Sequence, residues 1–389
     1  EPPKPGGRIC LEGVVFFWTR LSFSWKMVIR NIFRNRRRSA FLVLGIALTF
    51  GVIMVPVFMS NVWNNMFKLQ YEEFQTMDYN IDFTRPMDMG VLREIGQIID
   101  VDYMEAKMEM PLELRYGWNK KIVNVIGITG NTQFYNFENI SGGRVNLPED
   151  GMLIPKRLAN ILGVGVGDAI QAKNFLPNKE DAYIEVGGII EQYSGMNAYI
   201  DIGTMNNLLG ERNVITGVLL DSGDEVTSKL RDVKNIRQVE SKADIINSLM
   251  EFMGMIFMSM TVLIGFGGAL GFAIVYNISL ISINERILEF SSLRVLGFNK
   301  SEIFRMITRE NVLMTILGIL LGIPVGYGMC AGLASSVSTD LYSIPMMINV
   351  RDYMTAAFIT ICFIVIGQLA TSRKIQHLNF MDALKNRAT

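Results

Sequence analysis

The sequence contains very few of the side chains on which catalysis and metal binding most often depend. It has one histidine, His377, and three cysteines, Cys10, Cys330 and Cys362, which lie far apart. A histidine-based triad, a zinc site with several histidines and a framework of disulfide bonds all need more of these residues, placed closer together. We therefore predict neither catalytic residues nor a metal site in this chain.

Nucleotide-binding loops are missing as well. The glycines of 163–168 have the wrong spacing for a dinucleotide fingerprint, and they follow a helical pattern instead of a strand. Residues 297–301 match only a fragment of a phosphate-binding loop. We interpret 163–168 as a turn and expect no nucleotide or other cofactor bound to this chain.

Net charge is also absent, because 37 Lys and Arg residues balance 37 Asp and Glu residues. No dense basic stripe with interleaved aromatic residues is present, which argues against a nucleic acid as partner. Hydrophobic residues make up 50% of the chain and charged residues 19%, too apolar for an ordinary soluble domain and too charged for a protein buried throughout in a membrane. The composition predicts a chain with both kinds of region.

What the sequence does have is four long uncharged runs, each reaching the roughly 20 residues that a helix needs to cross a bilayer. No charged residue lies in the central part of any run, which argues against a secondary transporter or an ion channel. The predicted order is a cytosolic linker with an interfacial helix (1–38), a first span (39–60), an extracytoplasmic domain (61–250), a second span (252–284), a cytosolic coupling hinge (285–310), a third span (311–339), a short external loop (340–352), a fourth span (353–372) and a cytosolic tail (373–389).

The orientation follows from the distribution of basic residues. A cluster of five arginines, Arg30, Arg34, Arg36, Arg37 and Arg38, lies directly before the first span and indicates that this end is cytoplasmic. The predicted cytosolic segments hold 18 Lys and Arg against 7 Asp and Glu, whereas the remainder holds 19 against 30. We expect a multi-pass protein of the cell membrane with both ends of this chain in the cytoplasm.

Residues 14–32 mix apolar and aromatic clusters with Arg20 and Lys26 and therefore cannot span a membrane. An amphipathic helix lying in the membrane interface is the favoured interpretation, and a soluble helix packed on an upstream domain is the alternative. The Pro- and Gly-rich opening 1–7 is typical of a linker that follows an upstream region.

Residues 61–250 are predicted to form an α+β domain inserted between the first two spans. Strand-like runs occur at 121–126, 152–154, 183–190 and 214–220, and helical patterns occur at 91–99, 156–162, 224–234 and 241–250. We expect the last of these helices to be continuous with the second span. The predicted fold class is an α-helical membrane protein with four transmembrane helices and an extracytoplasmic α+β domain.

Glycines recur every fourth residue within two of the spans, and this spacing places them on one helical face. They are Gly267 and Gly271 in the second span and Gly318, Gly322 and Gly326 in the third. Close packing among the helices of this chain and contact with a partner half are both open.

The charged hinge between the second and third spans is expected to contain a short helix. Ile287, Phe290 and Leu293 would share one face by their spacing, Gly297 would end the helix, and Ser301 would cap the next one. The alternatives are a solvated charged loop and a docking knob for a cytosolic motor protein.

This hinge resembles the signature of the FtsX-like permeases, the membrane subunits of ABC transporters of the MacB and LolC type. The positions that match are Arg286, Glu289, Leu293, Arg294, Leu296 and Gly297, whereas Phe290, Ser291 and Ser292 depart from the small or aliphatic residues usual there. Residues 30–35, 145–172 and 382–385 resemble further segments of the same family, and residues 1–25 resemble the middle of long two-half permeases of Gram-positive bacteria. On this basis we expect the chain to be the second half of a longer protein.

The resemblance implies a mechanism called mechanotransmission. A dimeric cytosolic ATPase that binds ATP and Mg²⁺ would push the hinge, tilt the spanning helices and change the shape of the external domain. The expected contacts to the ATPase are Arg286, Glu289, Leu293, Arg294, Val295, Leu296 and Gly297, and the other expected partners are a second permease half or copy and the lipid bilayer. The family acts on lipoproteins, amphipathic peptides and antibiotics, or transmits force to cell-wall hydrolases.

Two alternatives use the same architecture. A sensor would bind a peptide outside and signal to a membrane histidine kinase, and a scaffold would activate an external cell-wall hydrolase without moving a substrate. An enzyme in its own right is the least favoured class, because no catalytic set is recognisable in residues 61–250.

Overall fold

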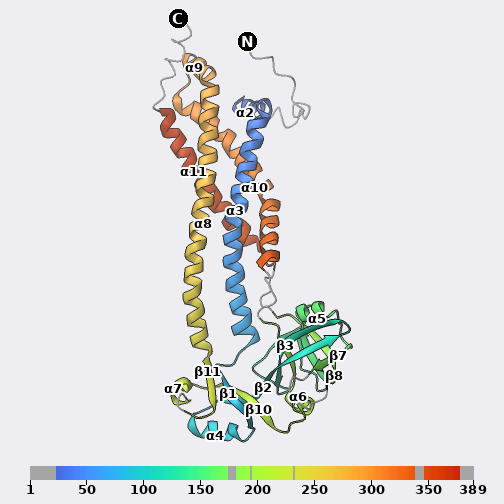
Figure 1. Ribbon diagram of the computed structural model, residues 1–389. Coiled ribbons are helices and arrows are strands. Elements are labelled where there is room, and N and C mark those ends of the chain that lie inside the picture. The colour runs from blue at the N-terminus through green and yellow to red at the C-terminus, as the bar shows by residue number, and fades with distance from the viewer. Residues whose placement is uncertain (1–22, 174–180, 193–194, 231–232, 338–345, 377–389) are drawn as a thin grey trace. The chain divides into compact units, whose positions relative to one another are not determined.

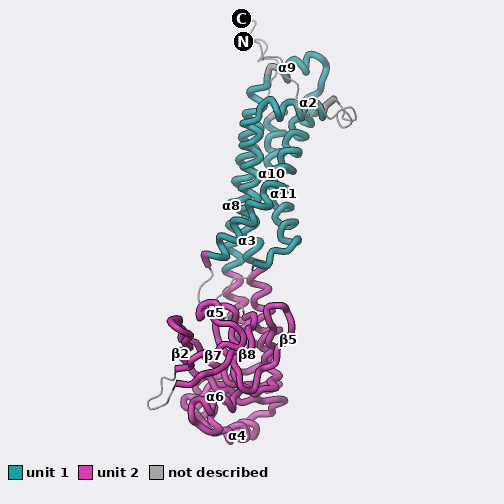
Figure 2. The backbone as a smooth tube through the Cα atoms, turned by 90° about the vertical axis from the view of Figure 1, so that its right-hand side faces the viewer, with its two compact units in different colours: residues 1–61, 256–335, 346–389 teal, residues 62–255, 336–345 magenta. Residues whose placement is uncertain are grey.

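The computed structural model describes residues 23–173, 181–192, 195–230, 233–337 and 346–376. The chain divides into two compact units, coloured separately in Figure 2. Unit 1 comprises residues 1–61, 256–335 and 346–389, and unit 2 comprises residues 62–255 and 336–345.

Unit 1 is helical, and its helices are labelled in Figure 1. They are α2 (Phe23–Arg34), α3 (Arg36–Lys68), α8 (Lys242–Glu285), α9 (Ile287–Val295), α10 (Lys300–Val337) and α11 (Val350–Gln376). Of these, α3 and α8 extend well into unit 2, and the last two residues of α10 belong to it as well. Within the described residues, α3, α8, α10 and α11 are long and apolar enough to cross a membrane. The four apolar runs of the sequence are therefore four helices.

Two helices extend well beyond the apolar runs that predicted them. The first begins at Arg36, runs to Lys68 and continues as the π-helix η2 (Leu69–Phe74), whereas the predicted span covers only 39–60. The second, α8, has 44 residues, which confirms that the helix expected at 241–250 is continuous with the following span.

Some expectations fall on residues that the structure does not describe. Of the helix predicted over 14–32, the part from Phe23 onward is described, and it forms α2. The resembling segment 382–385, His377 and the first six residues of the predicted loop 340–352 lie outside the described residues.

The regularly spaced glycines of α8 and α10 pack against α3. A Cβ at Gly318 would lie 2.6 Å from Cγ2 of Ile46, and one at Gly271 would lie 2.7 Å from Cγ2 of Thr49. Gly322, Gly326 and Gly267 likewise face α3, at Phe50, Met54 and Ile53. The structure therefore shows these glycines in close packing among the helices of this chain, which is one of the two interpretations left open by the sequence.

Hydrogen bonds between polar side chains also connect α8, α10 and α11. The Asn311 side-chain amide donates to Ser279 Oγ at 2.9 Å and to Gln368 Oε1 at 2.6 Å, and Gln368 donates in turn to Thr308 Oγ1 at 3.1 Å. Each of these polar groups thereby finds a partner away from water, as buried polar groups must.

Unit 2 contains a nine-stranded sheet of order β11-β1-β10-β2-β3-β9-β6-β8-β7. Its strands are β1 (Tyr79–Asp88), β2 (Tyr103–Tyr116), β3 (Asn119–Ile128), β6 (Gly151–Pro155), β7 (Ala169–Lys173), β8 (Ala182–Ile190), β9 (Ala198–Asp201), β10 (Val214–Asp221) and β11 (Ile236–Ser241), and β4 (Phe137–Glu138) pairs with β5 (Arg144–Val145). A further pairing of β7 with β2 closes six of the strands into a ring. The long strand β2 therefore belongs both to this ring and to the β10-β1-β11 extension.

The α+β prediction for this region is confirmed. The helices of unit 2 outside α3 and α8 are α4 (Val91–Ile98), α5 (Lys156–Leu162), α6 (Ile202–Leu209) and α7 (Val226–Leu230). The four predicted strand runs lie within β3, β6, β8 and β10. The elements that were not predicted are β1, β2, β4, β5, β7, β9, β11 and α6. The predicted turn at 163–168 is also confirmed, because Gly163 ends α5 with a positive φ of 73°.

Candidate functional site

The short helix α9 lies between the ends of α8 and α10 (Figure 1). Its Phe290 ring is fully buried, and Ile287 and Leu293 pack beside it. This face rests on Ile283 of α8 and on Ile303 and Ile307 of α10. The predicted apolar face of the hinge helix is thus confirmed, and the interpretation as a solvated loop is wrong.

The C-terminal end of α9 is exposed and is followed directly by a glycine turn. Gly297 adopts φ 97°, a left-handed conformation that glycine takes without steric cost. The N–H of Phe298 donates to the carbonyl of Leu293 at 3.0 Å, and the N–H of Gly297 donates to that of Arg294 at 3.1 Å, which together form a Schellman motif. Just before this turn, Val295 is 68% and Leu296 75% exposed.

The next helix is capped differently from the prediction. Asn299 precedes α10, its carbonyl accepts from the N–H of Glu302 at 3.1 Å, and its own N–H donates to the Glu302 carboxylate at 2.8 Å. The expectation that Ser301 is the cap is wrong, because Ser301 lies inside the first turn. The Glu302 carboxylate supplies the side-chain hydrogen bond of this cap.

A buried group of charges fastens α9 to the rest of unit 1. Arg286, just before α9, is 5% exposed, and its Nη1 lies 3.4 Å from Oε2 of Glu310 on α10. The other oxygen of Glu310 is 3.0 Å from Nη2 of Arg38 on α3. The buried Glu310 carboxylate therefore joins two arginines from different parts of the chain. Removal of the carboxylate, or of the arginines, would leave a buried charge without its partner, which is costly.

The network continues to the surface through Glu289 and Glu285. The Glu289 carboxylate is 2.9 Å from Arg286 Nε and 2.8 Å from Arg34 Nη2 on α2, and Arg38 also reaches Glu285 at 3.2 Å. Partial burial acts to raise the pKa of Glu289, but the hydrogen bond from Arg286 and the charges of both arginines outweigh it and hold the pKa below its ordinary value. Three arginines and three glutamates thus link α2, α3, α8, α9 and α10, and we call them the charge network.

An open hollow lies between α2 and α9. Its lining residues are Arg30, Asn31 and Arg34 from α2 and Glu289, Ser292, Leu293 and Leu296 from α9. Its volume is about 300 Å³, the volume of about ten water molecules in the liquid. One wall is basic, and the opposite wall is partly apolar.

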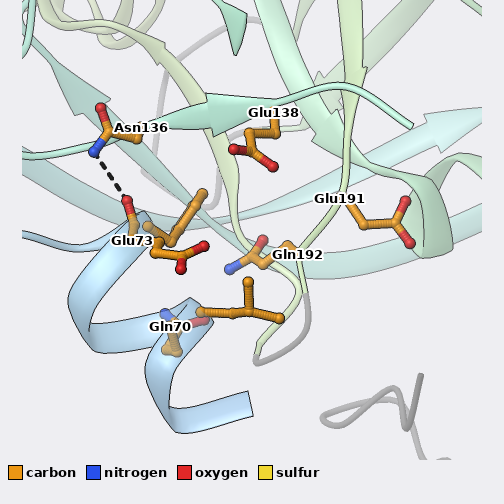
Figure 3. Close-up of a pocket in the computed structure, with 8 residues that line it drawn as sticks. Gln70, Glu73, Asn136, Glu138, Glu191 and Gln192 are labelled. Carbon is orange, nitrogen blue, oxygen red and sulfur yellow. Dashed lines mark hydrogen bonds between the residues drawn. The ribbon is translucent and has the colours of Figure 1, made fainter. Parts of the chain in front are cut away.

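Unit 2 has a smaller pocket, where η2 meets the ends of two strands (Figure 3). Glu73, Glu138 and Glu191 line it together with Gln70, Asn136 and Gln192, and the Asn136 side chain donates to the carbonyl of Glu73 at 2.9 Å. Its volume is about 30 Å³, room for about one water molecule. Among the described residues, no group of three or more His, Cys, Asp or Glu side chains could hold a metal ion. The volume of this pocket lies far below the roughly 300–1,000 Å³ of typical ligand-binding pockets.

The helices around α9 match a known protein family. Residues 261–380, which include α9, α10 and α11, match the profile of the family described as FtsX-like permease C-terminal. This part of the chain is therefore similar to the C-terminal region of FtsX-like permeases. The chain is also 22% identical over 400 residues to an uncharacterized ABC transporter permease, YknZ of Bacillus subtilis (strain 168), covering 92% of this chain and 98% of that protein.

Two solved structures are similar to parts of the chain. The extracellular domain of the transporter YknZ from Gram-positive bacteria matches with 13% identity and a TM-score of 0.31, covering 45% of this chain and 95% of that domain. The periplasmic region of MacB from Actinobacillus actinomycetemcomitans matches with 12% identity and a TM-score of 0.31, covering 46% of this chain and 94% of that region.

The structure divides the residues expected to contact the ATPase into an exposed group and a group that is partly or fully buried. Val295, Leu296 and Gly297 form the exposed end of α9, and Arg294 donates to the carbonyl of Phe298 at 3.0 Å beside them. Leu293 is partly buried and Glu289 is held by two arginines. Arg286 is not an exposed contact, contrary to expectation, because it is buried in the charge network.

The departures from the FtsX-like signature are mostly internal. Phe290 is fully buried, with the Arg286 guanidinium 4.9 Å from the centre of its ring, and Ser291 is 1% exposed. Only Ser292 reaches the surface. The ring at 290 therefore lies on the buried face of α9 and not at its exposed end.

Four residues of the network are absent from the predicted site: Arg34, Arg38, Glu285 and Glu310. In the sequence the two arginines belong to the positive-inside signal, and the two glutamates are among the many charges of the hinge. The sequence feature that could have identified Glu310 is its position at the boundary of an apolar run, where an unpaired carboxylate would be costly.

Proposed function

We propose that this chain is the membrane subunit of an ABC transporter and that it transmits movement of a separate ATPase through its spanning helices to unit 2. The observation that carries the proposal is the construction of α9. Its buried face is fixed to α8 and α10, while Val295 and Leu296 are exposed at its end. Exposed apolar side chains on a rigid projection are typical of a protein–protein contact.

The charge network makes α9 suitable for transmitting force. A push on α9 reaches α10 through the Arg286–Glu310 pair and reaches α3 through the Glu310–Arg38 pair. Both α3 and α8 contribute residues to unit 2 as well as to unit 1. Movement of these helices would therefore act directly on the folded unit.

The remaining parts of the proposal follow the positive-inside rule and the family resemblance. The end that carries α9 lies in the cytoplasm, where a dimeric ATPase binds ATP and Mg²⁺, and unit 2 lies outside the cell membrane. A second permease half or copy completes the complex. The transported or extracted molecule belongs to the lipoproteins, amphipathic peptides or antibiotics handled by such permeases.

Replacing Val295 with aspartate is expected to weaken binding of the ATPase at least tenfold and to abolish stimulation of its activity. Burying an exposed valine contributes about 1.5–3 kcal/mol, and a buried, unpaired carboxylate would add a penalty. The measurement is co-purification of the ATPase with the full chain, followed by its hydrolysis rate in reconstituted membranes.

Val350→Asp is the matched control, because Val350 is 76% exposed at the beginning of α11 and lies outside α9. It should leave both readouts unchanged. Equal ATPase binding by the Val295→Asp variant and the unmodified chain would contradict the proposal. A Glu289→Lys reversal is a poorer probe, because the new lysine would face Arg34 and Arg286 and disturb α9 itself.

A further inference from the structure

The long helices α3 and α8 join neighbouring strands of unit 2. The π-helix η2 that continues α3 ends at Phe74, and β1 begins at Tyr79. Helix α8 follows β11 without a break, because Ser241 ends the strand and Lys242 begins the helix. Tyr79 pairs with Ser241, and the N–H of Lys242 donates to the carbonyl of Asp78 at 2.8 Å. By chain connection alone, both helices would therefore act on the same two paired strands.

The sheet of unit 2 has two parts on which the helices could act. We call the closed ring of β2, β3, β9, β6, β8 and β7 the strand ring, and we call β10, β1 and β11 the strand extension. Strand β2 links the two parts, because it pairs with β10 over residues 103–107 and with β3 over residues 108–116. The chain connections of α3 and α8 both lead into the strand extension.

Aromatic contacts join the end of α3 to the strand ring instead. Phe74 is 8% exposed, and the centre of its phenyl group lies 5.9 Å from that of Tyr199 on β9. It lies 5.8 Å from the centres of Tyr135 and Phe137, in the connection between β3 and β6. All three contacts are edge-to-face, the geometry that aromatic pairs prefer. Phe74 therefore connects α3 with strands to which its chain connection does not lead.

Hydrogen bonds strengthen this connection. The N–H of Thr76 donates to the carbonyl of Phe134, and the N–H of Asn136 donates to the carbonyl of Phe74, both at 3.0 Å. The Asn136 side chain adds a bond to the carbonyl of Glu73 at 2.9 Å (Figure 3). The end of α3 is thus fixed to the connection between β3 and β6 by backbone and side chain together.

The end of α3 and the start of α8 are not packed tightly against each other over this stretch. A hollow of about 370 Å³ lies between them. It is lined by Tyr71 and Gln75 near the end of α3, by Lys242 and Ile245 of α8, and by Met77, Asp78, Asn80, Tyr135 and Glu240. The two helix ends therefore have space in which to approach or separate.

We propose that Phe74 is a positioning residue that transmits movement of α3 to the strand ring, whereas α8 transmits its movement to the strand extension through β11. This inference rests on the proposed function and deepens it. The shape change of unit 2 is then a displacement of the strand ring relative to the strand extension. The sheet bends at β2, between Lys107 and Met108, and the hollow between the helix ends changes its width.

The test measures this displacement with two nitroxide labels and pulsed electron paramagnetic resonance. One label is placed at Tyr183 on β8 of the strand ring and the other at Gln238 on β11 of the strand extension, both exposed. The three native cysteines are replaced by serine, and the full chain is reconstituted in lipid nanodiscs with its co-purified ATPase. The Tyr183–Gln238 distance is expected to shift when ATP and Mg²⁺ are added.

A second pair of labels, at Tyr183 and Asn160, reports on the strand ring alone. Asn160 is exposed on α5, which packs on β3, β6 and β8. This distance should stay constant, with ATP and in every variant in which unit 2 is folded.

Phe74→Ala should reduce the shift of the Tyr183–Gln238 distance about twofold or more, because it removes all three aromatic contacts. Phe74→Leu keeps an apolar side chain in the same place and should retain most of the shift. Phe67→Ala is the matched control: Phe67 also lies on α3, but it stacks on Trp63 of the same helix, with centres 6.0 Å apart. It should leave the shift unchanged.

The labelled chain with Phe74 intact decides the matter even if Phe74→Ala does not fold. A stimulated ATPase without a shift of the Tyr183–Gln238 distance would overturn the inference, and so would a full shift in Phe74→Ala or an equal loss in Phe67→Ala. In each of these cases the ATPase binds and is stimulated, so the proposed function stands. An ATPase that does not bind the chain overturns the proposed function and this inference with it.

Discussion

Replacing Glu310 with glutamine is expected to release α9 from the spanning helices and to destabilise unit 1 by about 3 kcal/mol. The glutamine keeps the size of the side chain but removes the charge that Arg286 and Arg38 share at 3.4 and 3.0 Å. The value lies at the lower end for a broken buried pair, because each arginine keeps a second carboxylate, Glu289 or Glu285.

Two measurements on the purified full chain check this expectation. Hydrogen exchange of residues 287–296 should accelerate, because the network no longer holds α9 in place. The apparent melting temperature of the helical unit should fall by about 5–10 °C. Stimulation of the ATPase should fall as well, although the surface of α9 that is proposed to bind the ATPase, around Val295, is unchanged in sequence.

Glu285→Gln is the control for this prediction. Glu285 pairs with the same Arg38, at 3.2 Å, but its side chain is 58% exposed, and an exposed pair contributes about 0–1 kcal/mol. The two substitutions make the same chemical change to partners of one arginine and differ mainly in burial. If they had equal effects, the buried carboxylate would not be the element that fixes α9.

The existence of the four apolar helices and the C-terminal end of α9 could be predicted, because each depends on local sequence. Long uncharged runs indicate the four apolar helices, and Gly297 indicates where α9 ends. The charge network could not be predicted in the same way. Arg38 and Glu310 are far apart in the chain, and each is an ordinary hinge or membrane-boundary charge until folding brings the two together.

Strand β2 shows the same limit in unit 2. Its sequence contains Lys107, Glu109 and Pro111, residues that argue against a strand. In the structure the Lys107 side chain is 2% exposed, and its ammonium lies 2.6 Å from Asp82 of β1 and 3.2 Å from Glu109. A partner from a distant strand therefore makes this lysine acceptable in the sheet, and only the tertiary fold supplies that partner.

Alanine substitutions at two glycines of α10 are expected to have opposite effects. At Gly318 a Cβ would lie 2.7 Å from Cβ of Ile46 and 3.2 Å from the carbonyl oxygen of Val43, neither of which can move without shifting α3. Overpacking of this kind costs about 1–3 kcal/mol. At Gly328, on the same helix, a Cβ would meet nothing within 4 Å.

The expected result is a lower melting temperature of the full chain with Gly318→Ala and an unchanged or higher one with Gly328→Ala. Alanine favours a helix over glycine by about 1 kcal/mol. Gly328→Ala should therefore gain stability, whereas at Gly318 the cost of the clash exceeds this gain. Thermal unfolding in detergent and again in lipid nanodiscs provides the measurement. Equal losses at both positions in nanodiscs would show that Gly328 is also packed in the membrane, which would restore contact with a partner half as the reason for glycines on α10.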